Sequence, residues 1–458
     1  MLVLGVMDFS LEQAIIIPAL PAIGAEYSAS LTSVTWVITG FLVAAAVATP
    51  LAGRLGDHLG KRLVILASLV LFAVGSVLCV VAGSIGLVIA GRVLQGLGAG
   101  VGPLATALAR DLVPRDQVPR AVGLLIGAGG LGGTIGLLVA GPLADDVSVQ
   151  SIFWVLAGVA VLLAVAVAAL VPDSGVRARA RVDWLGAGLL AGLLGTLMLA
   201  ISQGNEWGWS SARVLGLFGA SLTFALAFLA RERTAREPLV DPRALSARPV
   251  WSAQVTVFTV GVALFVAYAL VPQIGGLPVE TGYGLGLTTT EIALVLTPGA
   301  LAALAGGIAG GRLVAAVGAR NQAVLGVALA ALAYLGFIAF TETVAVTTLA
   351  LIPLGFGTGL ALTAIVDLIV LSVPAAETGV AMGINSVTRA VGAAIGAAVA
   401  VAIVTGAAQL APGVPEAGGF TAAFVMAFVA TLIALASLAL MPRRSGDPVL
   451  AMARPARV

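Results

Sequence analysis

Long apolar stretches alternate with short polar segments along the whole chain. A helix of about 18 to 25 apolar residues is long enough to cross the roughly 30 Å hydrocarbon core of a bilayer. The pattern therefore predicts an all-α integral membrane protein with fourteen spanning helices, at residues 2–24, 34–53, 63–83, 85–107, 120–141, 151–171, 184–202, 211–230, 250–274, 291–311, 321–340, 344–371, 379–406 and 420–441.

Composition supports this interpretation. The 458 residues are 60% hydrophobic with a mean hydropathy of +1.13, which is more apolar surface than a soluble core of this length can bury. A net charge of +2 gives no sign of a nucleic-acid partner. The single histidine, His58, and the single cysteine, Cys79, have no partners for a catalytic, metal or cofactor site, so we expect none of these. We expect Cys79 to serve packing and His58 to lie in a solvated loop.

The charges are distributed unequally between the two sides of the membrane. An even number of spans places both termini on one side, and 20 of the 23 Lys and Arg residues fall in loops or tails on that side. The positive-inside rule therefore predicts a multi-pass plasma-membrane protein with both termini in the cytoplasm. The first span has no basic segment before it and contains Asp8 and Glu12, so we expect it to be retained and not cleaved as a signal peptide.

One charged segment occurs twice. The stretch GRLGDHLGKR at 53–62 is echoed by GRLVAAVGAR at 311–320, and each copy follows an even-numbered span. Two related halves in parallel orientation are typical of rocker-type transporters. The second copy has Ala315 in place of Asp57 and Ala319 in place of Lys61, so the two halves are not equivalent.

Several segments together resemble a known family. GRLGDHLGKR resembles the cytoplasmic loop signature of the major facilitator superfamily, GRVLQGLGAG at 91–100 resembles its fourth-span motif, and EQAIIIPALPAI at 12–23 is similar to its first-span acid followed by Ala-Leu-Pro. The segments DWLGAG, SQGNEWGW, REPLVDPRAL and NSVTRAVGAAIG resemble the fourteen-span drug/proton antiporter branch.

This resemblance implies a domain organisation. It predicts an N-terminal six-helix half at 1–175, two inserted spans and a cytoplasmic linker at 176–249, a C-terminal six-helix half at 250–441 and a cytoplasmic tail at 442–458. We expect a monomer, in which the two halves rock around a central cavity.

In the family, the first loop latches the two halves together on the cytoplasmic side. Asp57 would then act near the start of the thirteenth span, around Gly379, because a carboxylate can pair with a helix N-terminus. Glycines permit close helix approach and unusual backbone angles, and the two basic residues mark the cytoplasmic surface. The alternative is a charge cluster that only sets topology. The predicted gating loop comprises Gly53, Asp57, Gly60, Lys61 and Arg62.

Charged residues inside spans are expensive, at about 2.5 to 3.5 kcal/mol near the bilayer centre, and are functional by default. Asp8 and Glu12 are four residues apart and so share one helix face. Glu12 takes the family's first-span acid position, and its depth allows it to meet Arg92. A purely structural ion pair between the first and fourth spans is the alternative. Burial disfavours an ionised Glu12 and Arg92 favours it, which suits a group that binds and releases a proton.

Two further charges lie in spans of the second half. A long Arg389 side chain in the thirteenth span is able to bridge to Asp367 in the twelfth, either as a structural pair or as part of the transport path. The predicted proton-coupling or substrate residues are thus Glu12, Asp8, Arg92, Asp367 and Arg389.

The fifth span departs from the antiporter signature. GGTIGLLVAG supplies Gly132, Gly136 and Gly141, but Leu137 stands where the signature has proline, and a Gly-Pro follows only at 141–142. This departure weakens the case for proton antiport over uniport, and it leaves the predicted fold unchanged.

We therefore expect proton-coupled export of a hydrophobic or cationic amphipathic compound by alternating access. A facilitator that imports a small solute is the alternative, and it predicts several polar side chains in the spans, which are few here. A membrane enzyme or sensor requires a cytoplasmic domain or a cluster of reactive side chains, and the sequence has neither, so we expect no enzymatic activity.

Overall fold

The computed structural model describes residues 1–114, 118–175, 177, 183–235, 248–339, 343–370, 378–411 and 414–440. These residues are almost entirely helical, as the long apolar stretches require, because a helix satisfies every backbone hydrogen bond within its own segment.

A first group of helices forms what we call the N-terminal bundle. Its elements are α1 (Leu2–Glu26), α2 (Leu31–Leu59), α3 (Lys61–Val80), α4 (Ile85–Leu97), α5 (Val101–Leu112), α6 (Val118–Pro142), the short π-helix η1 (Leu143–Val147) and α7 (Val149–Leu170).

Two helices, α8 (Trp184–Trp207) and α9 (Ala212–Thr234), follow and pack against each other. The C-terminal bundle then comprises α10 (Arg248–Gly276), the 3-10 turn η2 (Val279–Thr281), α11 (Thr289–Val317), α12 (Ala319–Ala339), α13 (Val344–Val370), α14 (Thr378–Gly406), the antiparallel strands β1 (Gln409–Ala411) and β2 (Val414–Pro415), and α15 (Ala417–Ala439).

Among the described residues, 13 helices are long and apolar enough to cross a membrane, by length and composition. This count takes α4 and α5 together as one span, Ile85–Ala109. The 25-residue α6 occupies the position predicted for the fifth span but is outside the 13. The fourteen-span count stays a prediction.

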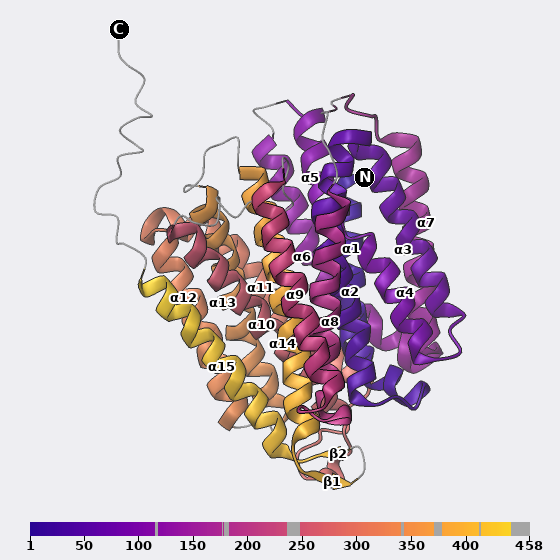
Figure 1. The fold of residues 1–458 in the computed structure, drawn as a ribbon, viewed down its shortest axis with the longest axis vertical. Helices are drawn as coiled ribbons and strands as arrows, with labels where there is room; N and C mark the ends of the chain where they lie inside the picture. The colour runs from indigo at the N-terminus through magenta and orange to yellow at the C-terminus, as the bar shows by residue number, and fades with distance from the viewer. Residues whose placement is uncertain are drawn as a thin grey trace.

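The two bundles lie side by side and meet along two seams (Figure 1). One seam joins α2 to α14, and the other joins α6 to α11. The α8–α9 pair covers the first seam, where α8 contacts both α2 and α14. The β1–β2 hairpin lies at the end opposite to the start of α1 (Figure 1), which is the end predicted to face outward.

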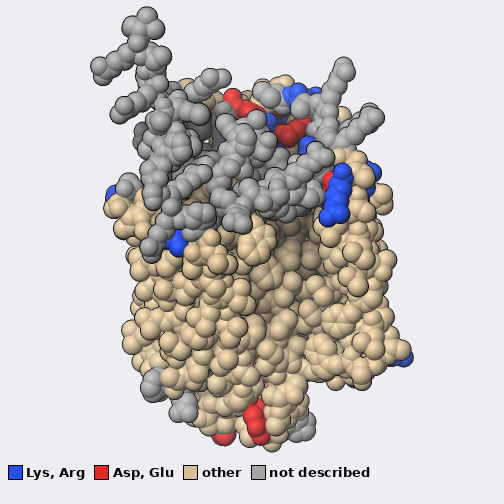
Figure 2. Space-filling view, turned by 60° about the vertical axis from the view of Figure 1, so that its left-hand side comes forward, with Lys and Arg blue, Asp and Glu red and all other residues tan. Residues whose placement is uncertain are grey.

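Charge is concentrated at the two ends of the molecule. In the face shown in Figure 2, basic and acidic side chains gather at the upper rim and acidic side chains appear at the lower end. A broad band almost free of charged side chains separates the two ends. Such a band is the surface that lipid tails require.

The predicted fourth span is interrupted. Helix α4 ends at Leu97 and α5 begins at Val101, so the break falls in the glycine-rich GLGAG segment. Gly98 lies so close to α3 that an added Cβ would be 2.7 Å from the carbonyl oxygen of Ser68. Glycine sequences of this kind are a common cause of kinks.

The repeated loop has a matching backbone conformation in both copies. Gly60, between α2 and α3, has φ +107°, and Gly318, between α11 and α12, has φ +79°. Positive φ favours glycine, since other residues are strained there. By contrast, Gly53 has no atom within 4 Å of an added Cβ, so close helix approach is not what Gly53 provides.

The similarity between the two bundles is also visible in how their helices pack. An added Cβ at Gly132 on α6 would overlap the carbonyl oxygen of Met7 on α1, and one at Gly136 would come within 2.6 Å of the Leu11 carbonyl oxygen. These glycines therefore bring the α6 backbone against the segment of α1 that contains Asp8 and Glu12.

In the C-terminal bundle, Gly392 and Gly396 on α14 likewise lie so close to the backbone of Phe258 and Val262 on α10 that an added Cβ would overlap it. Close backbone approach through small residues is the usual way in which helices associate in lipid. These glycines on α6 and α14 therefore allow close packing against α1 and α10.

Candidate functional site

Two carboxylates are buried in α1. Glu12 is fully buried and Asp8 is 3% exposed, and none of their four carboxylate oxygens has a hydrogen-bond partner. The two groups repel each other when both are ionised, since they lie one helical turn apart. A buried polar group without a partner is costly, and a buried unpaired charge is more so. The carboxylates are therefore not explained by the packing of α1.

Arg92 lies at the centre of a buried polar network beside α1. Its Nε donates to the carbonyl oxygen of Val37 at 3.1 Å, and its Nη1 donates to Oε1 of Gln95 at 2.6 Å. Gln95 in turn donates to the hydroxyl of Ser76 at 2.7 Å. The guanidinium carbon lies 4.5 Å from the centre of the Phe41 ring, a cation–π arrangement.

The contacts of Arg92 bear on the prediction that Glu12 and Arg92 meet. The two side chains attract each other electrostatically, but no ion pair joins them among the described residues. Arg92 instead uses a backbone carbonyl and Gln95. The sequence offered a sign of this, because Gln95 lies within the recognised GRVLQGLGAG segment three residues after Arg92. We did not identify Gln95 or Ser76 from the sequence.

The predicted gating loop ties α2 and α3 to other helices of the same bundle. Lys61 is buried and forms an ion pair with Asp111 on α5 at 2.6 Å, whereas its Nζ is 3.9 Å from Asp57. Arg62 donates to the carbonyl oxygen of Ala168 on α7. Lys61 therefore holds α3 to α5 and does not simply mark the membrane surface, because Asp111, which sequence reasoning missed, neutralises it.

Asp57 itself is 48% exposed at its side chain. Its predicted contact near Gly379 concerns a part of α14 whose side chains lie outside the described residues, so that contact stays a prediction.

At the opposite end, an acidic residue joins the two bundles. Asp145, in η1 directly after α6, accepts hydrogen bonds from the backbone nitrogens of Thr289 and Thr290 at 3.1 and 2.7 Å and from the Thr290 hydroxyl at 2.7 Å. These nitrogens begin α11, where a helix leaves its first N–H groups unpaired. Asp145 thus caps a helix of the other bundle.

This contact gives a structural account of the late Gly-Pro in the fifth span. Gly141 lies against α11 so closely that an added Cβ would overlap the Cα of Thr290. Burial raises the pKa of the Asp145 carboxyl. The hydrogen bonds from Thr290 and Thr289 together lower it by more than burial raises it, so its pKa lies below the ordinary value. The ionised carboxylate therefore favours a closed seam at this end.

The other seam is joined by α8. Trp36 on α2 donates to the Ser202 hydroxyl at 3.0 Å, and Asn205 donates to the carbonyl oxygen of Ala402 and the hydroxyl of Thr405 on α14, at 2.6 and 2.9 Å. The segment SQGNEWGW, recognised in the sequence, thus supplies both contacts.

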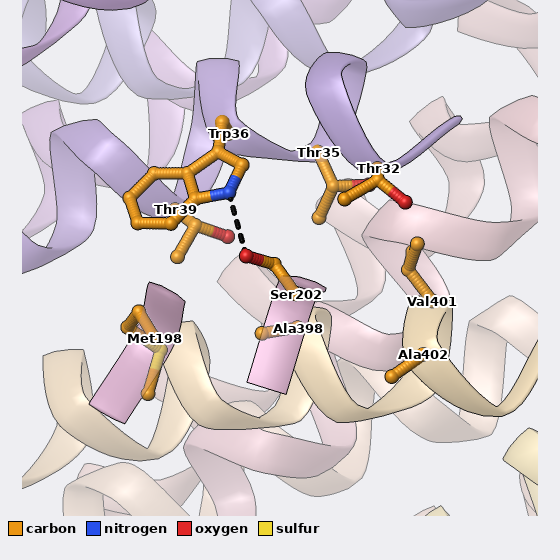
Figure 3. Close-up of a pocket in the computed structure, with 9 residues that line it drawn as sticks. All are labelled: Thr32, Thr35, Trp36, Thr39, Met198, Ser202, Ala398, Val401 and Ala402. Carbon is orange, nitrogen blue, oxygen red and sulfur yellow. Dashed lines mark hydrogen bonds between the residues drawn. The ribbon is translucent and has the colours of Figure 1, made fainter. Parts of the chain in front are cut away.

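Figure 3 shows a small pocket between these helices, with the Trp36 indole pointing at Ser202. It has room for about one water molecule, so it is too small for a substrate.

The acid and base predicted in the second half are not brought together. Asp367 on α13 and Arg389 on α14 are both partly buried, and no hydrogen bond or ion pair joins them in the described part of the chain. A search of the described residues also finds no group of three or more metal-ligating side chains.

The architecture is that of a multi-pass helical membrane protein. Residues 2–397 match the family model of the Major Facilitator Superfamily. The chain therefore belongs to this superfamily, and it is a transporter, not an enzyme.

Relatives within the superfamily include antibiotic exporters. The chain is 32% identical over 400 residues to the tetracenomycin C resistance and export protein of Streptomyces glaucescens, covering 85% of this chain and 72% of that protein. It is 30% identical over 404 residues to the probable actinorhodin transporter of Streptomyces coelicolor, covering 84% and 68%. The crystal structure of the human organic anion transporter MFSD10 has the same fold, with a TM-score of 0.62, 17% identity, and coverage of 95% and 97%.

Proposed function

We propose that this transporter exports hydrophobic or amphipathic compounds, such as drugs or antibiotic-like metabolites, in exchange for protons. The direction and substrate class are supported by the relatives, whose names describe export of tetracenomycin C and transport of actinorhodin. We assign the chain to the fourteen-span drug/proton antiporter branch on the segments quoted from its sequence.

The observation that carries the proposal is the buried Glu12 carboxyl group, whose two oxygens lack any hydrogen-bond partner. An ionised carboxylate in this position is strongly disfavoured, and binding a proton removes its charge. When the path to Glu12 opens, water or a cationic substrate stabilises the ionised form instead. A proton and a substrate then compete for one carboxylate, which couples their movements in opposite directions.

The neighbouring residues have supporting roles in this mechanism. Asp8 lies one turn nearer the predicted cytoplasmic end and helps a proton or a cation to enter. Arg92, held by Val37 and Gln95, supplies a fixed positive charge that favours the ionised form of Glu12 once water arrives. Because no hydrogen bond ties Glu12 to Arg92, protonation of Glu12 breaks no bond in the network.

Alternating access requires a closed seam at one end at a time. The Asp145 contact joins the two bundles at the end that we take to be the outer one, and we propose that it keeps that end closed. We propose that it breaks when the outer side opens, and that the loop containing Asp57 then latches the cytoplasmic side. Asp367 and Arg389 would line the transport path in the C-terminal half.

The proposed arrangement is a plasma-membrane monomer with both termini in the cytoplasm and with α8 and α9 inserted between two six-helix halves. A single-cysteine test addresses the topology. A thiol introduced by His58→Cys should react only with reagents on the cytoplasmic side, and one introduced by Glu206→Cys only with reagents outside. Labelling of both from one side contradicts the fourteen-span arrangement.

The function is tested with purified protein in liposomes that contain a pH-sensitive dye. Tetracenomycin C and actinorhodin are suitable first probes, since the relatives' names give them. The proposal predicts that a transported compound triggers proton flux in the opposite direction, and that the Glu12→Gln protein, which has lost the proton-binding carboxylate, shows no such flux. Compound movement with no proton flux at any pH contradicts antiport.

One observation favours a second candidate. Leu137 is buried where the antiporter signature has proline, which suits a facilitator that moves a small solute without protons. Saturable solute uptake into liposomes that is independent of the pH gradient would support this candidate.

A further inference from the structure

A second cavity lies away from the carboxylates, in the C-terminal bundle. It is a groove of about 520 Å³ between α10, α14 and α15. Its walls are almost entirely apolar and include Phe258, Val262, Ile395 and Met426. A volume in this range suits a drug-sized molecule. The small pocket beside Trp36, by contrast, holds about one water molecule.

The groove opens on the surface that faces lipid. Ile433 and Val429 on α15 line the groove and are 53% and 46% exposed, and Trp251 on α10 is 55% exposed. Trp251 is the fourth residue of α10, which begins at the predicted cytoplasmic end, and tryptophan is enriched at membrane interfaces. The groove therefore runs from the inner interface toward the middle of the bilayer.

One polar side chain in the groove has no partner. Gln254 is 7% exposed, and neither its Nε2 nor its Oε1 has a hydrogen-bond partner. A buried amide that makes no hydrogen bond is costly, because it has lost its bonds to water. Nearby polar groups on α10 are satisfied: Ser252 donates to the Ser437 carbonyl oxygen and Thr256 to the Ser252 carbonyl oxygen.

The depth of Gln254 indicates what binds there. It lies three residues after Trp251, where the membrane-spanning part of α10 begins, which is about 4.5 Å along the helix at 1.5 Å per residue. The ester carbonyl of a phospholipid can accept a hydrogen bond from Nε2 at that depth, but neither the ester nor the acyl chain has a donor for Oε1. A molecule that satisfies both ends of the amide must bring a donor and an acceptor into the hydrocarbon, attached to an apolar body that fills the groove.

We propose that this groove is a binding site for uncharged amphipathic small molecules that enter from the inner leaflet, with Gln254 hydrogen-bonded to an amide-like group of the ligand. The ligand's apolar part lies between α14 and α15 along Ile395 and Met426. This inference goes beyond the proposed export function, because binding here requires neither a proton gradient nor Glu12.

The test is photolabelling of the purified full chain in lipid nanodiscs without any gradient. The probe is N-hexyl benzophenone-4-carboxamide, which carries one donor, one acceptor and a photoreactive ketone. Its control is 4-hexylbenzophenone, which has a similar apolar body without the amide. Mass spectrometry of the α15 peptide that contains Met426 measures labelling.

We expect the carboxamide probe to label this peptide at least ten times more in the natural protein than in the Gln254→Leu variant, and the control probe to label both proteins equally and weakly. Val399→Phe, which fills the groove, should abolish labelling by the carboxamide. Val425→Phe, an exposed position on α15 outside the groove, should not change it.

Because Gln254 makes no hydrogen bond, Gln254→Leu should melt at or above the temperature of the natural protein, which verifies that the variant is folded. Equal labelling of the two proteins by the carboxamide, or labelling that the control probe matches, overturns the proposal and makes the groove an ordinary lipid-covered surface.

Discussion

The two bundles of this transporter pack by the same contacts but differ in their polar residues. In the N-terminal bundle, Gly136 on α6 lies against Leu11 of the first helix, α1. In the C-terminal bundle, Gly396 on α14 lies against Val262 of the first helix, α10. The next residue is Glu12 in the N-terminal bundle and Ala263 in the C-terminal bundle. The backbone arrangement has thus been kept on both sides, and the buried carboxylate is present on one side only.

The same comparison holds for the buried arginine. Gly96 on α4 packs against the backbone of Phe41, and Gly355 on α13 packs against the backbone of Gly299. Four residues before each glycine stand Arg92 in α4 and Leu351 in α13, both buried. The glycine contacts are thus common to both bundles, whereas the buried carboxylate and guanidinium at these positions occur only in the N-terminal bundle, where we propose that they serve proton coupling.

The largest expected effect concerns the loop at 53–62, whose Asp57 and Lys61 have alanines at the matching positions of the C-terminal bundle. Asp111→Asn removes the close partner of the buried Lys61 and should cost about 3 kcal/mol, because the buried charge then keeps only the half-exposed Asp57 at 3.9 Å. The melting temperature of the purified protein in detergent measures this loss.

Asp57→Asn is the matched substitution. Asp57 is half exposed and lies farther from Lys61, so the melting temperature should stay close to that of the natural protein. Transport into liposomes should nevertheless fall if Asp57 latches one access state. Full transport by Asp57→Asn would show that Asp57 is not a latch and that the loop only sets the topology.

The next effect tests what the two bundles share. Gly132→Ala and Gly392→Ala each place a methyl group onto a backbone carbonyl of the facing helix, so each should destabilise the protein by about 1 to 3 kcal/mol or more. Gly53→Ala, which has open space around it, serves as the control and should not destabilise. A clear difference between the Gly132 and Gly392 variants in melting temperature would break the proposed equivalence of the bundles.

The smallest effect concerns the outer contact between the bundles. Asp145→Asn weakens hydrogen bonds to a charged acceptor, so the amides of Thr289 and Thr290 should exchange with deuterium about tenfold faster, a difference of about 1.4 kcal/mol. Asp146→Asn, the adjacent acid, is the control. No change in exchange on Asp145→Asn would mean that the contact does not hold the outer end closed.

The pH dependence of this contact follows from the lowered pKa of Asp145. A carboxyl group with a lowered pKa in the closed state stabilises that state above its ordinary pKa of about 4, and the stabilisation is lost as the pH falls through the lowered value. The amide protection should therefore be constant between about pH 5 and 8, after correction for intrinsic exchange, and should fall only in stronger acid. The contact is thus not itself the proton sensor.

Much of the fold could be predicted from the sequence, since hydropathy alone locates the membrane helices and the glycine pairs indicate where they pack. The repeat at Gly60 and Gly318 was visible as a motif, and its positive φ values follow from the need for glycine. The break between α4 and α5 was not predicted, although the GLGAG segment contains its cause.

The candidate site was predicted only in part, because a sequence shows which residues are charged but not which distant helices face each other. Glu12 and Asp8 were recognised as buried. The partners of Arg92 and of Lys61 were not recognised. Val37 offers only a backbone carbonyl, and although Gln95 lies in a recognised motif and Asp111 is charged, the sequence does not show which side chains they face. The Asp145 contact was missed because it joins segments about 145 residues apart.

The central claim is that Glu12 is the carboxylate that couples protons to transport. It is tested most directly in liposomes with an imposed pH difference. The compound is one that triggers proton flux in the natural protein, and the measurement is its steady-state concentration ratio between the inside and the outside of the liposomes. We expect Glu12→Gln, which mimics the protonated form, to give a ratio of one while still exchanging labelled compound down its gradient, and Asp8→Asn to keep most of the accumulation. If Glu12→Gln still concentrates the compound against its gradient and Asp8→Asn does not, Asp8 is the coupling residue; if neither variant affects accumulation, the claim is wrong and Asp367 becomes the next residue to test.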